Sequence, residues 1–421
     1  MIKLKKAQEK DKNDPLASFK KEFHHPENEI YLDGNSLGKL PLKTKETIQT
    51  LINHQWGNKL IRSWNEHWLD LPNRLANKLA RLIGAKSNEV IIGESTSVNL
   101  YKLAHALMHT HLYPKQLLTD ALNFPTDNYI LEGLSENYNY PPTLCIRYPN
   151  DLRADLNEIK KVLKSNPGIL CLSLVTYKSA YYYPMLEINQ WAKEHQSVII
   201  WDFSHAVGAV NIDVKKTQTL AAIGCTYKYL NGGPGSPAFL YLDNTLHDQI
   251  KSPIKGWFGH QKPFDFADTY HPAEGIQQFY AGTPAVLSLA ALEVGLDITL
   301  RAGIKAIRKK NEALTQFLLQ EVECELISLG YAIESPKAVS ERGAHITLSH
   351  DESWRICQCL LNGKDDRPLI IPDFRPKNYI RLGIASLYIG FEDLLVTVHR
   401  LKEIIVHKEY LNYSQKKPRV T

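Results

Sequence analysis

The sequence predicts an α/β protein with a large domain, built on a mainly parallel seven-stranded sheet, and a smaller α+β domain. Between residues 88 and 245, short apolar runs alternate with amphipathic helical patterns, as expected of βαβ units. The run 198–201 is continuously apolar, which is typical of a strand buried on both faces. A long helical pattern over 285–323, interrupted near Gly303, then leads into a final region that mixes strands and helices.

The expected elements can be placed in order along the chain. Residues 44–85 are mainly helical, with Pro72 at a helix start and Gly84 near its end. The strands of the large sheet are expected at residues 89–93, 116–119, 143–146, 168–175, 198–202, 220–226 and 238–242. Further strands are expected at 345–349, 369–371 and 379–384, and further helices at 354–361 and 393–407. We expect three parts: an N-terminal segment over 1–60 that packs with the small domain, the large domain over 61–300 and the small domain over 301–421.

Composition excludes several classes of protein. With 43% hydrophobic and 23% charged residues, the 421-residue chain is globular rather than disordered. The net charge of +5 is mild, and the dense basic segments at 3–6 and 416–419 are typical of solvated tails, so we expect no nucleic-acid partner. No apolar stretch approaches the roughly 20 residues of a membrane span, and the N-terminus carries no signal core. The six cysteines form no Cys-x-x-Cys motif, so we expect free thiols in the cytoplasm.

An acid and a lysine follow strands of the predicted sheet, where ligands bind in open parallel sheets. Asp202 comes directly after the buried run 198–201, and Lys228 stands between two tyrosines before a glycine-rich turn. The carboxyl ends of parallel strands meet at one edge, so we expect the two side chains to lie together. Alone, Asp202 is equally consistent with a helix N-cap, and a single lysine is more often solvated.

Two further groups lie at the same edge of the predicted sheet. Ser95, Thr96 and Ser97 precede a helix, whose free N–H groups can bind an anion, although plain capping is the commoner role of such residues. Phe124 follows another strand and can stack on a planar ligand or pack within its loop. Together, a lysine, an acid, an anion cradle and an aromatic wall are what pyridoxal 5′-phosphate (PLP) requires.

At this point the sequence resembles the kynureninase family, PLP enzymes of the aspartate-aminotransferase fold, PLP fold type I. The DGNSLG and GWFGH sequences are specific to that family, whereas the pair Asp202 and Lys228 indicates only the wider fold. Ser386 stands where the family usually has proline. The matching segments are 31–38, 124–127, 202–208, 227–231 and 256–260, with Arg381, Leu387 and Tyr388 near the end.

The resemblance implies hydrolysis of L-kynurenine or 3-hydroxykynurenine to L-alanine and an anthranilate, within tryptophan catabolism or NAD biosynthesis. It implies that Lys228 binds the cofactor covalently and moves the α-proton, that Asp202 pairs with the pyridine nitrogen, and that Tyr227 donates a proton. Arg381 would bind the substrate α-carboxylate and Trp64 its aromatic side chain. Further cofactor contacts are implied for Thr96, Ser97, Phe124, Asp127, Ser173, His205, Tyr227, Trp257 and Thr283.

The resemblance also implies a homodimer with shared active sites, in which Trp257 and Thr283 come from the second subunit. Two other classes of protein are alternatives. A transaminase or cysteine desulfurase would keep the fold and cofactor, but a desulfurase needs a mobile loop cysteine, and Cys324, Cys357 and Cys359 fall in helical patterns. A metal- or nucleotide-binding module is the third class. The Cys357-x-Cys359 pair lacks nearby partners at zinc spacing, so no metal is expected.

Overall fold

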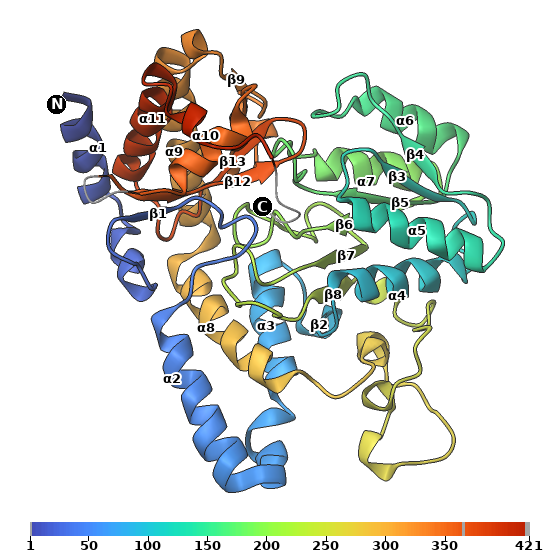
Figure 1. The fold of residues 1–421 in the computed structure, drawn as a ribbon. Helices are drawn as coiled ribbons and strands as arrows, with labels where there is room; N and C mark the ends of the chain where they lie inside the picture. Colours follow the sequence, from blue (N-terminus) through green and yellow to red (C-terminus); the bar gives the residue numbers. More distant parts are fainter. Residues whose placement is uncertain (1, 364–366, 417–421) are drawn as a thin grey trace.

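The computed structural model describes residues 2–363 and 367–416. Its centre is a seven-stranded sheet of order β2-β8-β7-β6-β5-β3-β4, in which β8 is antiparallel to both neighbours and the run from β7 to β4 is parallel (Figure 1). The predicted fold class is therefore confirmed. The strands are β2 (Val90–Ile92), β3 (Leu117–Asp120), β4 (Leu144–Ile146), β5 (Ile169–Ser173), β6 (Val198–Asp202), β7 (Ala221–Gly224) and β8 (Phe239–Leu242).

Helices cover both faces of this sheet. Alternate side chains of β5 enter different cores: Leu170 and Leu172 pack in one cluster, Ile169 and Cys171 in the other. Because both faces are buried, the strands are continuously apolar rather than alternating. The first face carries α3 (Leu71–Ile83), α6 (Leu156–Ser165), α7 (Met185–Glu194) and α8 (Val286–Ala302), and the second carries α4 (Thr96–Met108) and α5 (Pro125–Asn137).

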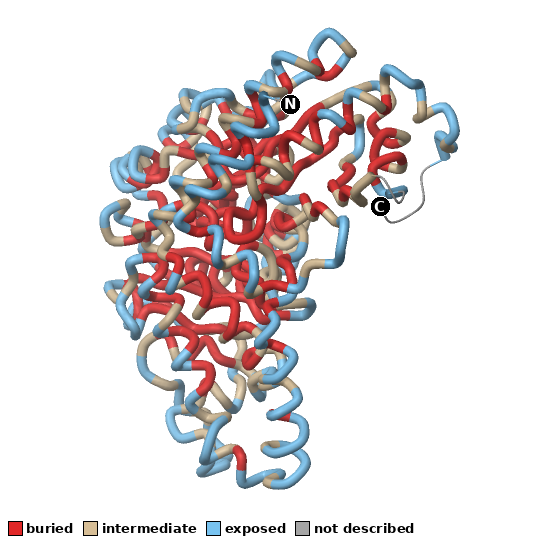
Figure 2. The backbone as a smooth tube through the Cα atoms, turned by 90° about the vertical axis from the view of Figure 1, so that its left-hand side faces the viewer, coloured by how far each residue is buried: buried red, intermediate tan, exposed pale blue. Residues whose placement is uncertain are grey.

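A second core lies around a four-stranded antiparallel sheet of order β12-β13-β10-β9. Helix α1 packs against α11, and β1 pairs with β11, so the N-terminal segment joins this part (Figure 1). Figure 2 shows buried residues filling the interior of both parts, whereas the lower end of the view is largely exposed. The elements are α1 (Ile2–Lys12), β1 (Glu29–Tyr31), α9 (Ile304–Glu325), β9 (Ala332–Ile333), β10 (His345–Ser349), α10 (Ser353–Leu360), β11 (Leu369–Ile371), β12 (Asp373–Arg375), β13 (Tyr379–Gly383) and α11 (Phe391–Val406).

Most predicted boundaries agree with the structure. Helix α3 has Pro72 in its first turn and ends at Gly84, whose φ of 72° is left-handed, and Gly303 separates α8 from α9. The region before α3 is less regular than a continuous helix. It comprises α2 (Leu42–Thr50), π-helices at Leu51–Lys59 and Trp64–Trp68, and a 3₁₀ turn at Leu60–Arg62. Other short 3₁₀ helices lie at Ala17–Glu22, Ser87–Glu89, Asn244–Leu246, Trp257–Gly259, Pro263–Asp265, Gly275–Phe279, Ile327–Leu329, Val339–Glu341 and Glu409–Asn412.

The N-terminal basic segment is solvent-exposed, as expected, but it is a helix rather than a tail. Residues 3–6 belong to α1, and Lys3 forms ion pairs of 2.9 Å with both Glu321 and Glu325 of α9. The helix was not predicted because these partners lie more than 300 residues away in sequence. Within the described residues, no helix is long and apolar enough to cross a membrane. Of the C-terminal basic segment, positions 417–419 lie outside the described residues.

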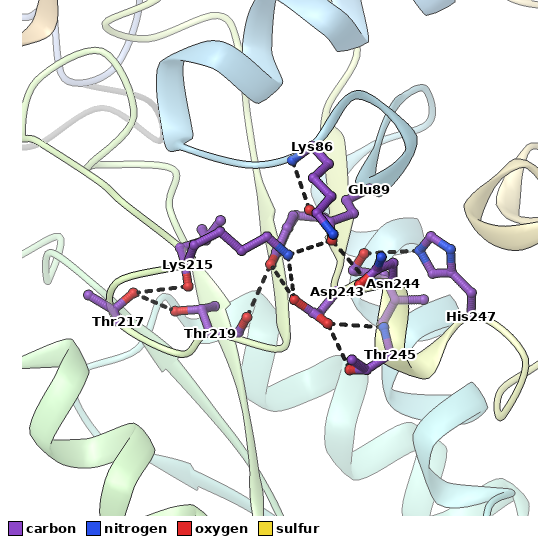
Figure 3. Close-up of polar contacts among 12 residues, drawn as sticks. Lys86, Glu89, Lys215, Thr217, Thr219, Asp243, Asn244, Thr245 and His247 are labelled. Atoms are coloured by element: carbon purple, nitrogen blue, oxygen red, sulfur yellow. Dashed lines mark hydrogen bonds and ion pairs between the residues drawn. The ribbon is translucent and has the colours of Figure 1, made fainter.

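At the amino-terminal edge of the large sheet, buried charges are paired with one another (Figure 3). The Glu89 carboxylate is fully buried and accepts hydrogen bonds from Lys86 N at 2.8 Å, Asn244 N at 3.1 Å and Lys215 Nζ at 2.5 Å. Lys215 Nζ also donates to Asp243 at 2.6 Å. Burial raises the pKa of Asp243, but hydrogen bonds from Lys215 and neighbouring groups outweigh it, so the pKa lies below its ordinary value. This network ties together the segments that flank β2, β7 and β8.

Candidate active site

A cavity of about 660 Å³ opens at the opposite, carboxyl-terminal edge of the same sheet. The loops that follow β2, β3, β5, β6 and β7 line it, together with the segment 280–285. Its size is that of a small-molecule or cofactor site. Ten of the thirteen residues predicted from the sequence line it: Thr96, Ser97, Phe124, Asp127, Ser173, Asp202, His205, Tyr227, Lys228 and Thr283.

Asp202 is the last residue of β6, in register with Ser173 of β5. Its carboxylate accepts hydrogen bonds from the N–H of Ser204 at 2.9 Å and from the hydroxyl of Ser204 at 2.5 Å. Burial raises the pKa of Asp202, while the Ser204 hydrogen bonds and the nearby Lys228 charge oppose this effect. The acid and the lysine therefore line one cavity and influence each other electrostatically.

Lys228 lies in the loop after β7, and the DGNSLG segment holds its backbone. The N–H of Gly38 donates to the carbonyl of Tyr227 at 2.8 Å. A Cβ at position 38 would come within 2.3 Å of the Lys228 carbonyl oxygen, so only glycine fits this close approach. On the other side, the Thr226 hydroxyl contacts Ser236 at 2.6 Å. The loop is thus fixed from two directions, with the lysine half-buried in the cavity wall.

The N-terminus of α4 forms another part of the wall. Ser95 is the N-cap, and its hydroxyl accepts a hydrogen bond from Val98 N at 3.3 Å. Thr96 and Ser97 start the helix, where unpaired N–H groups and the helix dipole favour an anion. Both roles proposed for this segment are therefore compatible, because one hydroxyl caps the helix while the adjacent residues face the cavity.

Several buried polar atoms in the cavity wall lack a hydrogen-bond partner within the described residues. They are Oδ2 of Asp127, Nδ1 of His205 and the hydroxyl of Tyr280. Burial raises the pKa of Asp127, and the neighbouring charge of Asp202 raises it further. Burial lowers the pKa of His205, with a further contribution from Lys228. Buried polar atoms are almost always paired, so this set fits a polar ligand that completes it.

Arg381 is set apart from the cavity. It is buried in β13, donates to Asp373 of β12 through Nε at 2.5 Å, and hydrogen-bonds the carbonyl of Tyr177. Tyr177 itself lines the cavity, so Arg381 lies behind that part of the wall. Burial lowers the pKa of Arg381, and the charge of Asp373 opposes this effect.

Trp64 and Trp257 do not line the cavity of their own chain. Trp64 contacts Phe258, with ring centroids 6.2 Å apart, and Trp257 contacts the same ring at 4.6 Å. Trp257 is 36% exposed, so this aromatic cluster is partly open to solvent. Thr283, which the resemblance assigned to a second subunit, lines the cavity of its own chain.

Sequence reasoning missed four residues at or beside the site: Tyr177, Ser236, Tyr280 and Asp373. Tyr177 follows β5, so the rule that located Asp202 was available for it as well. The pairing of Asp373 with Arg381 depends on the hairpin of β12 and β13, which sequence analysis did not resolve into two strands. Ser236 and Tyr280 lie in irregular loops that carry no periodic signal.

Comparison with known proteins gives matches along most of the chain. Two family models match: a kynureninase C-terminal domain at residues 307–401 and a class-V aminotransferase at residues 30–343. The kynureninase of Pseudomonas fluorescens is 36% identical over 405 residues, covering 95% of each chain. That of Burkholderia pseudomallei is 34% identical over 400 residues, covering 94% of each.

Solved structures share the fold at lower identity. The cysteine desulfurase from Thermococcus onnurineus NA1 has a TM-score of 0.76 and 17% identity, covering 95% of this chain and 98% of that one. C-DES, solved with glycine linked to its PLP cofactor, has a TM-score of 0.77 and 17% identity, covering 90% and 97%. At such identities the likeness shows the fold alone.

The sequence relatives are similar enough to this chain to indicate its function, whereas the structural neighbours indicate only its fold. They confirm the predicted family, and with it the enzyme class and the PLP cofactor. The desulfurases named among the structural neighbours are 14–17% identical to this chain, against 34–36% for the two kynureninases. The chain belongs to the kynureninase family.

Proposed function

We propose that this chain hydrolyses L-kynurenine, or its 3-hydroxy form, to L-alanine and the corresponding anthranilate, with PLP bound in the cavity at Lys228. The observation that carries the proposal is the placement of Lys228 and Asp202 in one cavity with the N-terminus of α4. That arrangement occurs in a chain that is 36% identical to a kynureninase over nearly its whole length.

The residues of the cavity fit the cofactor. Lys228 would bind it covalently, Asp202 would hold its pyridine nitrogen, and Phe124 would stack on its ring. Thr96, Ser97 and Tyr227 would hold the phosphate, and the buried Oδ2 of Asp127, which lacks a partner, would gain one. When bound, PLP supplies an electron sink for negative charge that develops on the substrate. Ser173 is a further contact, in register beside Asp202.

The chain's own groups account for binding and proton transfer. Asp373, the Tyr177 carbonyl and the Ser36 hydroxyl fix the plane of the Arg381 guanidinium, which leaves one of its five N–H donors, on Nη1, for a substrate carboxylate. Lys228 would remove and return the proton at the substrate α-carbon. Burial raises the pKa of Tyr227, so its phenol stays protonated at neutral pH and can act as a proton donor.

We also propose that the protein is a homodimer whose copies complete each other's sites. Two exposed segments, residues 52–64 and 257–266, carry large apolar side chains. The contact between Trp64 and Phe258 joins them into one surface. Within the first segment, Leu60 has a φ of 52°, a strained conformation for a branched residue on a free surface. The exposed apolar residues of this surface are Ile52, Trp56, Leu60, Ile61, Trp257, Phe264 and Phe266.

Complementation of inactive variants tests the shared site. Lys228→Ala and Trp257→Ala chains, each inactive alone, should regain activity when unfolded and refolded together, because a mixed dimer contains one intact site. No regain of activity from a mixture that does form mixed dimers would contradict the sharing. A single-chain mass in solution would contradict the dimer itself.

We propose the domain division expected from the sequence, 1–60, 61–300 and 301–421. It is supported by the separate cores, since Phe23 and Leu32 pack in the core of the small domain. Leu51 instead packs in the large-domain core, so the N-terminal segment divides between the two. We also propose the cytoplasm as the compartment, supported by six free cysteines.

The reaction is tested by incubation with L-kynurenine in the absence of any keto-acid acceptor. The proposal predicts fluorescent anthranilate and alanine in equal amounts. A keto acid in place of alanine would indicate a transaminase, and sulfur release from cysteine would indicate a desulfurase. Either result without anthranilate would contradict the proposed function.

A further inference from the structure

His345 is a fully buried histidine that the proposed function does not use. It lies on β10, where the Lys178 carbonyl is a weak hydrogen-bond partner of its ring and at least one of its ring nitrogens has no partner among the described residues. Burial lowers its pKa, and the positive charges of Arg381 and Lys228 lower it further, against a small opposite effect of the Lys178 carbonyl. His345 is therefore a neutral imidazole whose N–H has the Lys178 carbonyl as a weak partner and whose other nitrogen is a free acceptor.

The neighbour of His345 is His205, from the other part of the molecule. Their ring centroids lie 5.7 Å apart with an interplanar angle of 63°. His205 follows β6 and lines the cavity, and its Nδ1 is also buried without a partner. On the other side, β10 pairs with β13, where Thr347 lies opposite Arg381. His345 thus stands between a residue of the cofactor cavity and the strand of the carboxylate-binding arginine.

Unpartnered nitrogens in a buried pair are unfavourable, since each loses hydration without gaining a hydrogen bond. One hydrogen bond between two neutral imidazoles pairs one nitrogen of each ring, because each ring offers a donor and an acceptor. At 5.7 Å between centroids, a small approach of β10 toward the loop after β6 brings the rings within hydrogen-bond reach. The pair lies between the large sheet and the four-stranded sheet, and a bound substrate would contact residues of both.

We propose that His345 is a positioning residue: when the site is loaded, one of its ring nitrogens hydrogen-bonds Nδ1 of His205 and fixes that ring against the cofactor. This inference rests on the proposed function, because His205 can affect binding only by contacting bound PLP. It assigns His345 no contact with substrate or cofactor. Its effect passes through His205, and it couples binding in the cavity to the position of β10.

The inference separates stability from binding. In the protein without cofactor, His345 has only the weak contact with the Lys178 carbonyl to lose and a desolvated nitrogen to remove, so His345→Leu should leave its melting temperature unchanged or raise it. In the loaded protein the same variant lacks one buried hydrogen bond. Its dissociation constant for PLP and its KM should each rise about tenfold, the usual consequence of that loss. His345→Gln keeps a donor and an acceptor and should restore both values to within about threefold of wild type.

The matched control is His247, a buried histidine at the opposite edge of the sheet. Its Nε2 is hydrogen-bonded to the carbonyl of Leu242 at 3.1 Å. His247→Leu removes a bond that the folded chain already makes, so its melting temperature should fall while its PLP affinity stays at the wild-type value. The two leucine variants should therefore show opposite patterns.

The experiment measures the melting temperature without cofactor, the dissociation constant for PLP and the KM for L-kynurenine in wild type and the three variants. A His345→Leu protein that fails to fold, melts lower without cofactor, or binds PLP as wild type does would overturn the inference. So would a glutamine variant no better than leucine. A wild-type protein that binds no PLP would instead refute the proposed function, which keeps the two failures distinct.

Discussion

The two edges of the large sheet differ in whether their buried polar groups have hydrogen-bond partners. At the amino-terminal edge, Glu89, Lys215 and Asp243 are bound to one another and to backbone N–H groups (Figure 3). At the carboxyl-terminal edge, Oδ2 of Asp127 and Nδ1 of His205 are buried with no partner within the described residues. The same strands thus have one edge that is complete in the folded chain and one that a ligand would complete.

This contrast separates stability from activity. A buried charge that loses its only partner destabilises the fold, so the amino-terminal edge holds the fold together. An unpartnered polar group costs free energy that binding can recover. The carboxyl-terminal edge therefore lowers the stability of the unliganded protein and raises its affinity for a ligand. Substitutions at the two edges should therefore move different measurements.

The largest effect is expected for Lys228→Ala at the carboxyl-terminal edge. Loss of the amine that binds the cofactor and moves the substrate proton should reduce kcat/KM at least about 1000-fold. The melting temperature without cofactor should stay near that of wild type, because no hydrogen bond of the Lys228 side chain to a described residue is lost. Anthranilate release and thermal unfolding measure the two effects. Substantial activity in this variant would contradict the assignment of the lysine.

Next is Lys215→Met at the amino-terminal edge. It leaves the fully buried Glu89 without its ion-pair partner, and the free energy of unfolding should fall by about 3 kcal/mol. Denaturant unfolding measures the change, and kcat/KM per folded molecule should not move. The double variant Glu89→Gln with Lys215→Met should recover part of the loss, because no buried charge then remains unpaired. If the fully folded Lys215→Met protein lost activity, the proposed separation of stability and activity between the two edges would be contradicted.

Asp202→Asn should reduce kcat about 100-fold, because a neutral amide cannot hold the pyridine nitrogen of the cofactor protonated. Its effect on stability has the opposite sign to that at Lys215. Burial raises the pKa of Asp202 in the folded protein, so its ionised form opposes folding at neutral pH. The protein without cofactor should therefore melt at the same or a higher temperature after the substitution. A marked drop in that temperature would place Asp202 among the stabilising residues instead.

The smallest effect concerns the backbone and should be equal at both edges. Glu94, in the loop after β2, has a φ of 59°, and Gln218, before β7, has a φ of 54°; both residues are exposed. Glycine adopts this conformation without the steric cost, so each glycine variant should gain about 0.5 kcal/mol after its larger unfolded-state entropy is subtracted. Denaturant midpoints test this. A gain at only one edge would show that backbone strain, as well as polar pairing, distinguishes the edges.

Local pattern explains what could be predicted from the sequence. All seven strands of the large sheet and the placement of Asp202 and Lys228 at one edge follow from apolar runs and the geometry of parallel strands. Helix α1 was not predicted, because its sequence has little apolar character and its ion pairs connect Lys3 to α9, which is far away in the sequence. The pairing of Arg381 with Asp373 escaped for the same reason, since it depends on a hairpin register. The family resemblance supplied residue roles that periodicity does not contain.

The most direct test of the account is to locate the covalent attachment of the cofactor. Protein purified with PLP is reduced with borohydride, digested and mapped by mass spectrometry. The account predicts the mass of the reduced cofactor on the peptide that contains Lys228, and its absence from that peptide in Lys228→Ala. Attachment at another lysine, such as the buried Lys102, or no attachment at all, would contradict it.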